Sequence, residues 1–333
     1  MEKLNVGFKA YRILVCCCLV FTFFVISYGA YTRLTESGLG CPDWPGCYGA
    51  IWVHSQDLIQ INNLNDITFN EARIEMYHRY FAAFLGCLIL ILIFWNQFCR
   101  YHSLKLTYLL GMTLFFQVFL GKLTVTMLLK PAIIVSHFFG ALCICICLVF
   151  ILRALNLNKT NFTAFFKDKK ITYFTSYLFL FLILLQMTLG VWVSSNYASM
   201  VCSSFPICEY PWWSMYDLNA FNPLTTSANQ SYQFGVLNLE QRVTLHITHR
   251  FGAMILTIMM ILYVFQIFNL GYRKFAVLVI FIFILQILLG INNILSFLNI
   301  LNATLHNLVG VLLFVIVLYV HLKLRERCHE NYI

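Results

Sequence analysis

The chain has 333 residues, of which 61% are hydrophobic and only 11% are charged, and its formal net charge is +9. A soluble protein of this size carries roughly 25% charged residues, so this composition excludes a soluble globular domain. The Lys and Arg residues fall in short segments between apolar runs, which indicates membrane topology and gives no nucleic-acid-binding surface. We therefore expect a polytopic protein embedded in the lipid bilayer.

Apolar runs long enough to cross a membrane recur along the whole chain. Runs of about 18 residues or more predict spanning helices, because a helix satisfies its own backbone hydrogen bonds in lipid. The runs are continuous and do not alternate, which argues against a β-barrel. The sequence thus predicts an all-α membrane protein with eight transmembrane helices, at 12–31, 72–98, 106–127, 132–152, 171–193, 243–268, 274–294 and 303–322.

The orientation in the membrane follows from the positive side chains. Lys and Arg cluster at the N-terminus and after the second, fourth, sixth and eighth spans. By the positive-inside rule, both termini lie in the cytoplasm, and the long loops 32–71 and 194–242 lie outside. We see no cleavable signal and no presequence rich in Arg and Ser before the first span. We expect a multi-pass protein of the bacterial plasma (inner) membrane, although a processed mitochondrial protein would have the same features.

The two halves of the chain repeat the same spacings. The interval Gly29–Cys41 equals Gly190–Cys202, Cys41–Cys47 equals Cys202–Cys208, Gln117–His137 equals Gln286–His306, and Glu75–His78 equals His246–His249. Such self-similarity indicates tandem duplication of a four-helix unit. We expect two tandem pseudo-symmetric four-helix bundles, 1–155 and 156–333, related by a two-fold axis along the membrane normal.

Four histidines occupy matching places in this duplication. Each lies in the outer third of an even-numbered span: His78, His137, His249 and His306. Each half thus offers two imidazoles at one depth on two helices, which suits the two axial positions of a haem iron. Zinc would need further ligands in each half. For any one of these histidines alone, a hydrogen-bonded core residue would be the ordinary interpretation.

Five other histidines lie outside this pattern. His246 replaces Glu75 in the repeat and lies one turn before His249. It could line the second site, but the repeat favours His249 as the ligand. The others lie in loops or at a cytoplasmic end, and we expect them at the surface: His54, His102, His321 and His329.

Glu75 lies three residues before His78, hence on the same face of the helix. A carboxylate there could take a proton from a bound ligand or stabilise a developing cation on it. The second half has His246 at this place, so the pattern favours chemistry in the first half and cofactor binding in the second. The alternative is an interfacial carboxylate paired with Arg79 or Arg73.

Three arginines near the outer helix ends are candidates for pairing with carboxylates such as haem propionates, which a guanidinium binds well. They are Arg33, Arg79 and Arg250. The alternative is that these side chains extend to the membrane interface.

Two cysteine pairs lie in the outer loops, on the oxidising side of the membrane. The short and equal spacing of Cys41/Cys47 and Cys202/Cys208 predicts two local disulfides. We take these disulfides as structural, and a redox-active role stays open.

Several of these features together resemble the haem A synthase family. They are TRLTESGLGCPDWPGC at 32–47, EMYHR at 75–79, Gln-x-x-x-Gly in the odd spans, and four histidines in duplicated halves. The resemblance covers nearly the whole chain, and the loop motif is its most specific part. This family comprises membrane enzymes that convert haem O to haem A for cytochrome oxidase assembly.

The resemblance implies oxidation of the C8 methyl group of haem O to a formyl group by successive hydroxylations, with water as the proposed oxygen source. It implies that His78 and His137 hold the substrate haem, and that His249 and His306 hold a haem b cofactor. It places the family's essential glutamate at Glu75. It also matches the family's paired outer-loop cysteines.

Two other classes fit parts of the pattern. A di-haem b-type membrane electron carrier, without haem-modifying chemistry, would stack its histidine pairs at two depths. A duplicated transporter would have spans broken by Gly or Pro at mid-membrane, and the spans here are unbroken there.

The expected upstream partner is haem O synthase, a protohaem farnesyltransferase. The sequence does not name the electron acceptor, and it leaves the oligomeric state open, a homo-oligomer included. Neither His246 nor the second outer loop, with Trp212 and Trp213, matches a family motif.

Overall fold

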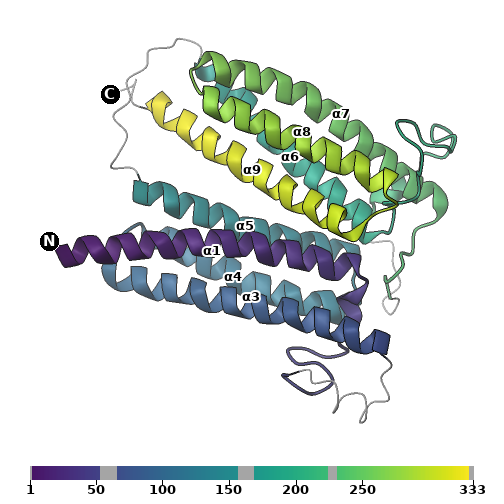
Figure 1. Ribbon diagram of the computed structural model, residues 1–333, viewed down its shortest axis with the longest axis horizontal. Helices are drawn as coiled ribbons and strands as arrows, with labels where there is room; N and C mark the ends of the chain where they lie inside the picture. Colours follow the sequence, from purple (N-terminus) through teal and green to yellow (C-terminus); the bar gives the residue numbers. More distant parts are fainter. Residues whose placement is uncertain (1, 53–65, 157–168, 224–230, 330–333) are drawn as a thin grey trace. The chain divides into compact units, whose positions relative to one another are not determined.

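The computed structural model describes residues 2–52, 66–156, 169–223 and 231–329 (Figure 1). These ranges contain eight helices that are long and apolar enough to cross a membrane, and no β-strand. The helices are α1 (Glu2–Leu34), α3 (Asp66–Cys99), α4 (Leu104–Thr126), α5 (Pro131–Asn156), α6 (Lys169–Ser195), α7 (Leu239–Asn269), α8 (Arg273–Leu295) and α9 (Ile300–His329). The short 3-10 helices η1 (Ser37–Leu39) and η3 (Leu218–Phe221) lie in the loops. The prediction of an all-α membrane protein with eight spans is confirmed.

Several helices extend beyond the predicted spans. The apolar run marks only the stretch inside lipid, whereas a helix continues through polar turns at the membrane surface. For example, α7 begins at Leu239 behind a capping box, in which the Asn238 and Gln241 side chains each bond the other's backbone N–H. Similarly, α3 begins at Asp66, before the predicted start at residue 72. Glu75 and His78 therefore lie in the third and fourth turns of α3.

The first compact unit contains α1, η1, α3, α4 and α5. Both α1 and α4 pack against α3 and α5, so the four helices form a closed ring (Figure 1). The apolar core fills the end of this ring away from the loop after α1, with the buried side chains Tyr11, Val15, Ile89, Leu92 and Leu148. The candidate site residues lie toward the other end.

The loop between α6 and α7 also contributes to this first unit. The Tyr232 backbone N–H donates to the Leu128 carbonyl oxygen at 3.0 Å, and Gln233 Nε2 donates to the Glu36 carbonyl oxygen at 3.3 Å. These two bonds lie within the first unit and hold residues 232 and 233 at the α4–α5 corner and at the turn after α1. The Tyr232 side chain is buried there.

The second compact unit contains α6, α7, η3, α8 and α9. Both α6 and α8 pack against α7 and α9, which again closes a ring of four helices. Fully buried side chains from all four helices fill it, including Phe179, Tyr263, Val279 and Val317. The two-fold axis relating the halves stays a prediction.

The irregular backbone of the two units follows the repeat. At the α4–α5 corner, Leu128 and Leu129 have φ of 49° and 61°, and at the α8–α9 corner Phe297 and Leu298 have φ of 52° and 61°. This left-handed region is uncommon for residues other than glycine. Its recurrence at equivalent corners means that the duplicated spacing extends to local backbone conformation.

Two histidines expected at the surface are buried, so that prediction was wrong for them. The Tyr11 hydroxyl lies 2.8 Å from His102 Nε2, and the Ser176 hydroxyl lies 3.1 Å from His321 Nδ1. Each imidazole thus finds a polar partner on another helix, which permits its burial. The side chains of His54 and His329 lie outside the described part of the chain.

Candidate functional site

The four candidate ligands come from opposite helices of each ring. His78 lies on α3 and His137 on α5, and neither helix packs directly against the other in the ring of the first unit. His249 on α7 and His306 on α9 have the same relation in the second unit. Each ring of helices therefore encloses one histidine pair.

A glycine on the neighbouring helix makes room for each imidazole, and we call these four residues the notch glycines. A Cβ atom on Gly29 would lie 2.8 Å from His78 Cε1, and one on Gly190 would lie 3.2 Å from His249 Cε1. The corresponding distances are 3.2 Å from Gly121 to His137 and 3.1 Å from Gly290 to His306. Any larger residue at these positions would push the imidazole away. This is the physical reason for the glycine in the Gln-x-x-x-Gly pattern.

The glutamines of that pattern lie beside three of the imidazoles. Gln117 Nε2 is 3.4 Å from His137 Nε2, and Gln286 Nε2 is 3.4 Å from His306 Nε2. Gln186 Nε2 lies 3.1 Å from His249 Nδ1 and donates to the His249 carbonyl oxygen at 2.8 Å. The sequence contained this pattern, but its contact with the histidines becomes visible only in the structure.

The donor set fits a haem iron better than a bare metal ion. The Nδ1 atoms of His78, His137 and His306 are buried and have no hydrogen-bond partner among the described residues. A buried ring nitrogen without a partner has the lone pair that an iron ligand needs. Across the described ranges, no group of three or more His, Cys, Asp or Glu side chains is arranged to hold a metal ion. Each unit instead offers two imidazoles from opposite helices, which suit the two axial positions of a haem.

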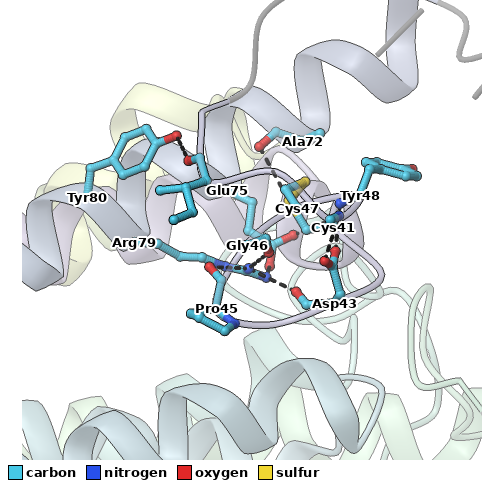
Figure 2. Close-up of a disulfide and its surroundings, with 12 residues drawn as sticks. Cys41, Asp43, Pro45, Gly46, Cys47, Tyr48, Ala72, Glu75, Arg79 and Tyr80 are labelled. Carbon is cyan, nitrogen blue, oxygen red and sulfur yellow. Dashed lines mark hydrogen bonds and ion pairs between the residues drawn. A yellow bond between two sulfur atoms is a disulfide. The ribbon is translucent and has the colours of Figure 1, made fainter. Parts of the chain in front are cut away.

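Glu75 lies beneath the first outer loop, where Figure 2 shows its surroundings. Its side chain is buried, and Oε2 accepts a hydrogen bond of 2.9 Å from the Cys41 backbone N–H. Oε1 pairs with the Arg79 guanidinium at 2.6 Å. The ion pair with Arg79, one of the two alternatives considered above, is thus present. Arg73 instead bonds Asn70.

The structure pairs Cys41 with Cys47 and Cys202 with Cys208. Both sulfur atoms of the first pair belong to fully buried residues, packed against Ala72 and Met76 of α3. The Cys41 backbone N–H is the Glu75 donor described above. The first disulfide loop therefore fixes one of the groups that orient the Glu75 carboxylate.

Arg79 and Arg250 hold the two disulfide loops. Arg79 donates to the carbonyl oxygens of Asp43, Pro45 and Gly46, as Figure 2 shows. Arg250 donates in the same way to the carbonyl oxygens of Cys202, Ser204 and Pro206. A guanidinium suits this task because it presents several donors in a fixed plane. The third candidate, Arg33, lies in the last turn of α1.

His246 takes the place of Glu75 in the second unit. Its side chain is buried, and Nδ1 lies 2.9 Å from the Ala198 carbonyl oxygen, in the turn after α6. This contact joins α7 to the turn, much as Glu75 joins α3 to the first loop. The second unit thus keeps a polar tie at this place but has no carboxylate.

The second outer loop covers the end of α7 with aromatic side chains, which the sequence alone did not assign. Trp212 packs edge-on against Phe251 at 5.2 Å between ring centroids, and the Tyr216 hydroxyl lies 3.1 Å from the Thr248 hydroxyl. Both contacts fall within two residues of His249. Large amphipathic rings with a polar group suit the membrane–water boundary. The loop therefore packs on α7 within one turn of His249.

Membrane-spanning four-helix units with one imidazole on each of two opposite helices are the arrangement expected of haem-binding membrane proteins. Residues 12–318 match the COX15-CtaA family, described as "Cytochrome oxidase assembly protein". A protein named "Heme A synthase" from Shewanella oneidensis is 38% identical over 298 residues, covering 87% of this chain and 89% of that protein. Another of that name, from Neorickettsia sennetsu, is 25% identical over 329 residues, covering 91% and 96%. The chain belongs to this family of haem A synthases, which confirms the resemblance noted in the sequence.

Proposed function

We propose that this protein oxidises the C8 methyl group of haem O to a formyl group, giving haem A for cytochrome oxidase. The reaction takes one water and releases four electrons and four protons as the methyl carbon becomes an aldehyde. Family membership supports the oxidation of haem O. The observation that carries the assignment of chemistry to one unit is the carboxylate beneath the first loop, which His246 replaces in the second.

The substrate haem would lie in the first unit, between His78 and His137. These imidazoles would hold the iron from opposite sides and so fix the plane of the macrocycle. Glu75 is three residues from His78 and faces the same side of α3. We infer that the methyl group to be oxidised is the one that this ligation brings nearest to Glu75.

Glu75 would serve as the group that receives a proton or stabilises positive charge at the reacting carbon. Its two oxygens are already fixed, one by Arg79 and one by the Cys41 N–H. A carboxylate that is fixed before the reaction needs no reorganisation during it.

The second unit would hold a haem b cofactor between His249 and His306. When bound there, this haem supplies one-electron redox chemistry that the side chains lack. His249 and His306 would ligate it, and the second outer loop would exclude water from its outer end. The electrons must finally reach an external acceptor.

The setting of the reaction follows from topology and from the substrate. We place both termini in the cytoplasm of a bacterium and both histidine pairs toward the outer face of the plasma membrane. An enzyme that makes haem O, a protohaem farnesyltransferase, would supply the substrate. Arg33, Arg79 and Arg250 are the candidates for pairing with haem propionates, and Arg79 and Arg250 also bind loop carbonyls.

The test is haem extraction and chromatography from membranes that co-express this chain with a source of haem O. Wild type should yield haem A or its hydroxylated intermediate. Glu75→Gln should abolish haem A while haem b stays bound. Glu71→Gln is a matched control, because it removes a carboxylate one turn earlier on the same helix, and it should leave haem A formation intact. Haem b alone in wild type would contradict the proposal and favour a di-haem electron carrier.

A further inference from the structure

Three of the four candidate ligands share a support that the fourth lacks. We define the glutamine clamp as a Gln one turn before the notch glycine, together with a second Gly one turn after the histidine. The clamps are Gln117 and Gly140 at His137, Gln186 and Gly252 at His249, and Gln286 and Gly310 at His306. We propose that His78, which has no glutamine clamp, is the exchangeable axial ligand of the substrate site. This inference rests on the function proposed above.

The clamp needs both of its parts. A Cβ atom on Gly140 would lie 2.1 Å from Gln117 Oε1, and one on Gly252 would lie 2.1 Å from Gln186 Oε1. A Cβ atom on Gly310 would lie 3.2 Å from Gln286 Nε2. The second glycine therefore makes the space that the glutamine amide fills beside the imidazole. A side chain in its place would displace the amide.

His78 has neither the glutamine nor the second glycine of the clamp. Val25 stands one turn before Gly29, and Phe81 stands three residues after His78, as Gly140 and Gly252 stand after their histidines. The Tyr28 ring is nearly parallel to the imidazole, with 5° between the planes and 6.4 Å between centroids. The Phe81 ring meets the Tyr28 ring edge-on at 5.1 Å. Apolar side chains thus occupy the two sequence positions that hold the glutamine and the second glycine at the other ligands.

An amide beside a ligand imidazole changes its bond to iron. When one ring nitrogen binds iron, the other carries a proton, which a glutamine Oε1 can accept. In the structure Nε2 of each of these glutamines lies nearest the ring nitrogen, and Oε1 is buried with no hydrogen-bond partner among the described residues. Turning the amide over would bring Oε1 to the ring proton. Such a hydrogen bond fixes the ring and makes it a stronger ligand, and its loss typically weakens metal binding roughly 10- to 100-fold. At His78 the place of that glutamine is taken by Val25, whose side chain offers no acceptor.

This difference suits what the two sites must do. A cofactor site retains its haem, and both of its ligands, His249 and His306, are clamped. A substrate site must admit one haem and release another in each turnover. It combines a clamped ligand, His137, with an unclamped one, His78. The ligand that gives way is also the one three residues from Glu75, so the open face of the iron would be the face nearest the carboxylate.

The test transplants the clamp into the substrate site of the full-length protein, as Val25→Gln/Phe81→Gly. The readout is the rate of carbon monoxide binding to the dithionite-reduced protein, because carbon monoxide binds only where an axial ligand has left. Wild type loaded with haem O should show one reactive haem. The double variant should bind carbon monoxide at least about 10-fold more slowly than wild type. It should also retain more substrate haem after detergent washing. Phe81→Gly alone, which makes space without the amide, should stay as reactive as wild type.

A reciprocal variant provides the test if the double variant does not fold. Gln286→Val removes one clamp from the cofactor site and should make the second haem reactive toward carbon monoxide. Unchanged rates in both variants would overturn the proposal. Counting haems in loaded wild type comes first: one haem in place of two would contradict the proposed substrate site itself, which separates that failure from failure of the exchangeable ligand.

Discussion

The two units differ most where a carboxylate in one is replaced by an imidazole in the other. Both have a notch glycine for each histidine, a six-residue disulfide interval and an arginine on the loop carbonyls. Beneath the loop, however, Glu75 binds a backbone N–H, whereas His246 contacts a backbone carbonyl. Under the proposed function, the common parts would hold a macrocycle in each unit. The carboxylate, which only the first unit has at this place, would exchange a proton with the substrate. One duplicated frame would then serve binding in one copy and chemistry in the other.

The largest expected effect comes from filling a notch. Gly29→Leu should displace His78, because even a Cβ atom there would lie 2.8 Å from the ring. We expect loss of the substrate haem and retention of the other. Gly190→Leu should do the reverse, and the pyridine haemochrome assay with haem identification would distinguish them. If each variant lost both haems, the two units would not bind independently, and the comparison would fail.

The next effect concerns the arginines. Arg79→Lys keeps the charge but loses the planar fork that joins Glu75 to the loop carbonyls. We expect haem A formation to fall roughly 100-fold, the scale for losing a group that organises transition-state charge. Arg250→Lys should weaken its loop while leaving the chemistry within a few-fold of wild type. Haem A per bound haem b is the measure, and equal losses in the two variants would argue against the carboxylate as the distinguishing feature.

Much of this arrangement was accessible from sequence, because lipid imposes simple rules. The eight spans follow from length and hydropathy, and the matched intervals around His78 and His249 suffice to predict both histidine pairs. The side chains that contact these histidines could not be predicted from the sequence. The contact between Gln117 and His137, for example, depends on how α4 packs against α5. The burial of His102 was missed for the same reason, because its partner Tyr11 lies on another helix.

The disulfides should affect stability alike but activity unequally. Each closes a loop of equal length, so removing Cys41–Cys47 or Cys202–Cys208 by paired Cys→Ser changes should cost about 2 kcal/mol. Only Cys41 donates its backbone N–H to Glu75. We therefore expect about a 10-fold loss of haem A formation in the first variant alone, the scale of a lost hydrogen bond to a charged group. Thermal unfolding of both variants would test the equal loss of stability. Similar haem A yields in the two variants would contradict the expected difference in activity.

The smallest expected effect is the pH dependence of the stability of the second disulfide loop. Glu209 accepts hydrogen bonds from the backbone N–H groups of Ser203 and Ser204 at 2.9 and 3.1 Å. Although partial desolvation acts in the opposite direction, these bonds hold the pKa of Glu209 below its usual value. Because the folded-state pKa is lowered, the carboxylate stabilises the loop fully above the unfolded-state pKa, about 4.5, and this contribution is lost as pH falls through the lower folded-state pKa.

Hydrogen exchange at the Ser203 and Ser204 amides would measure this contribution directly. Protection should persist at neutral pH, decline well below pH 4.5, and be absent at every pH in Glu209→Gln. In the first loop, Asp43 accepts from the Tyr48 and Gly49 N–H groups and should act as the corresponding tie. Because neither carboxylate contacts a histidine ligand, Glu209→Gln should leave both haems bound. Loss of the second haem in that variant would mean that the second loop helps to keep the haem bound. The difference between the two units would then include their loops.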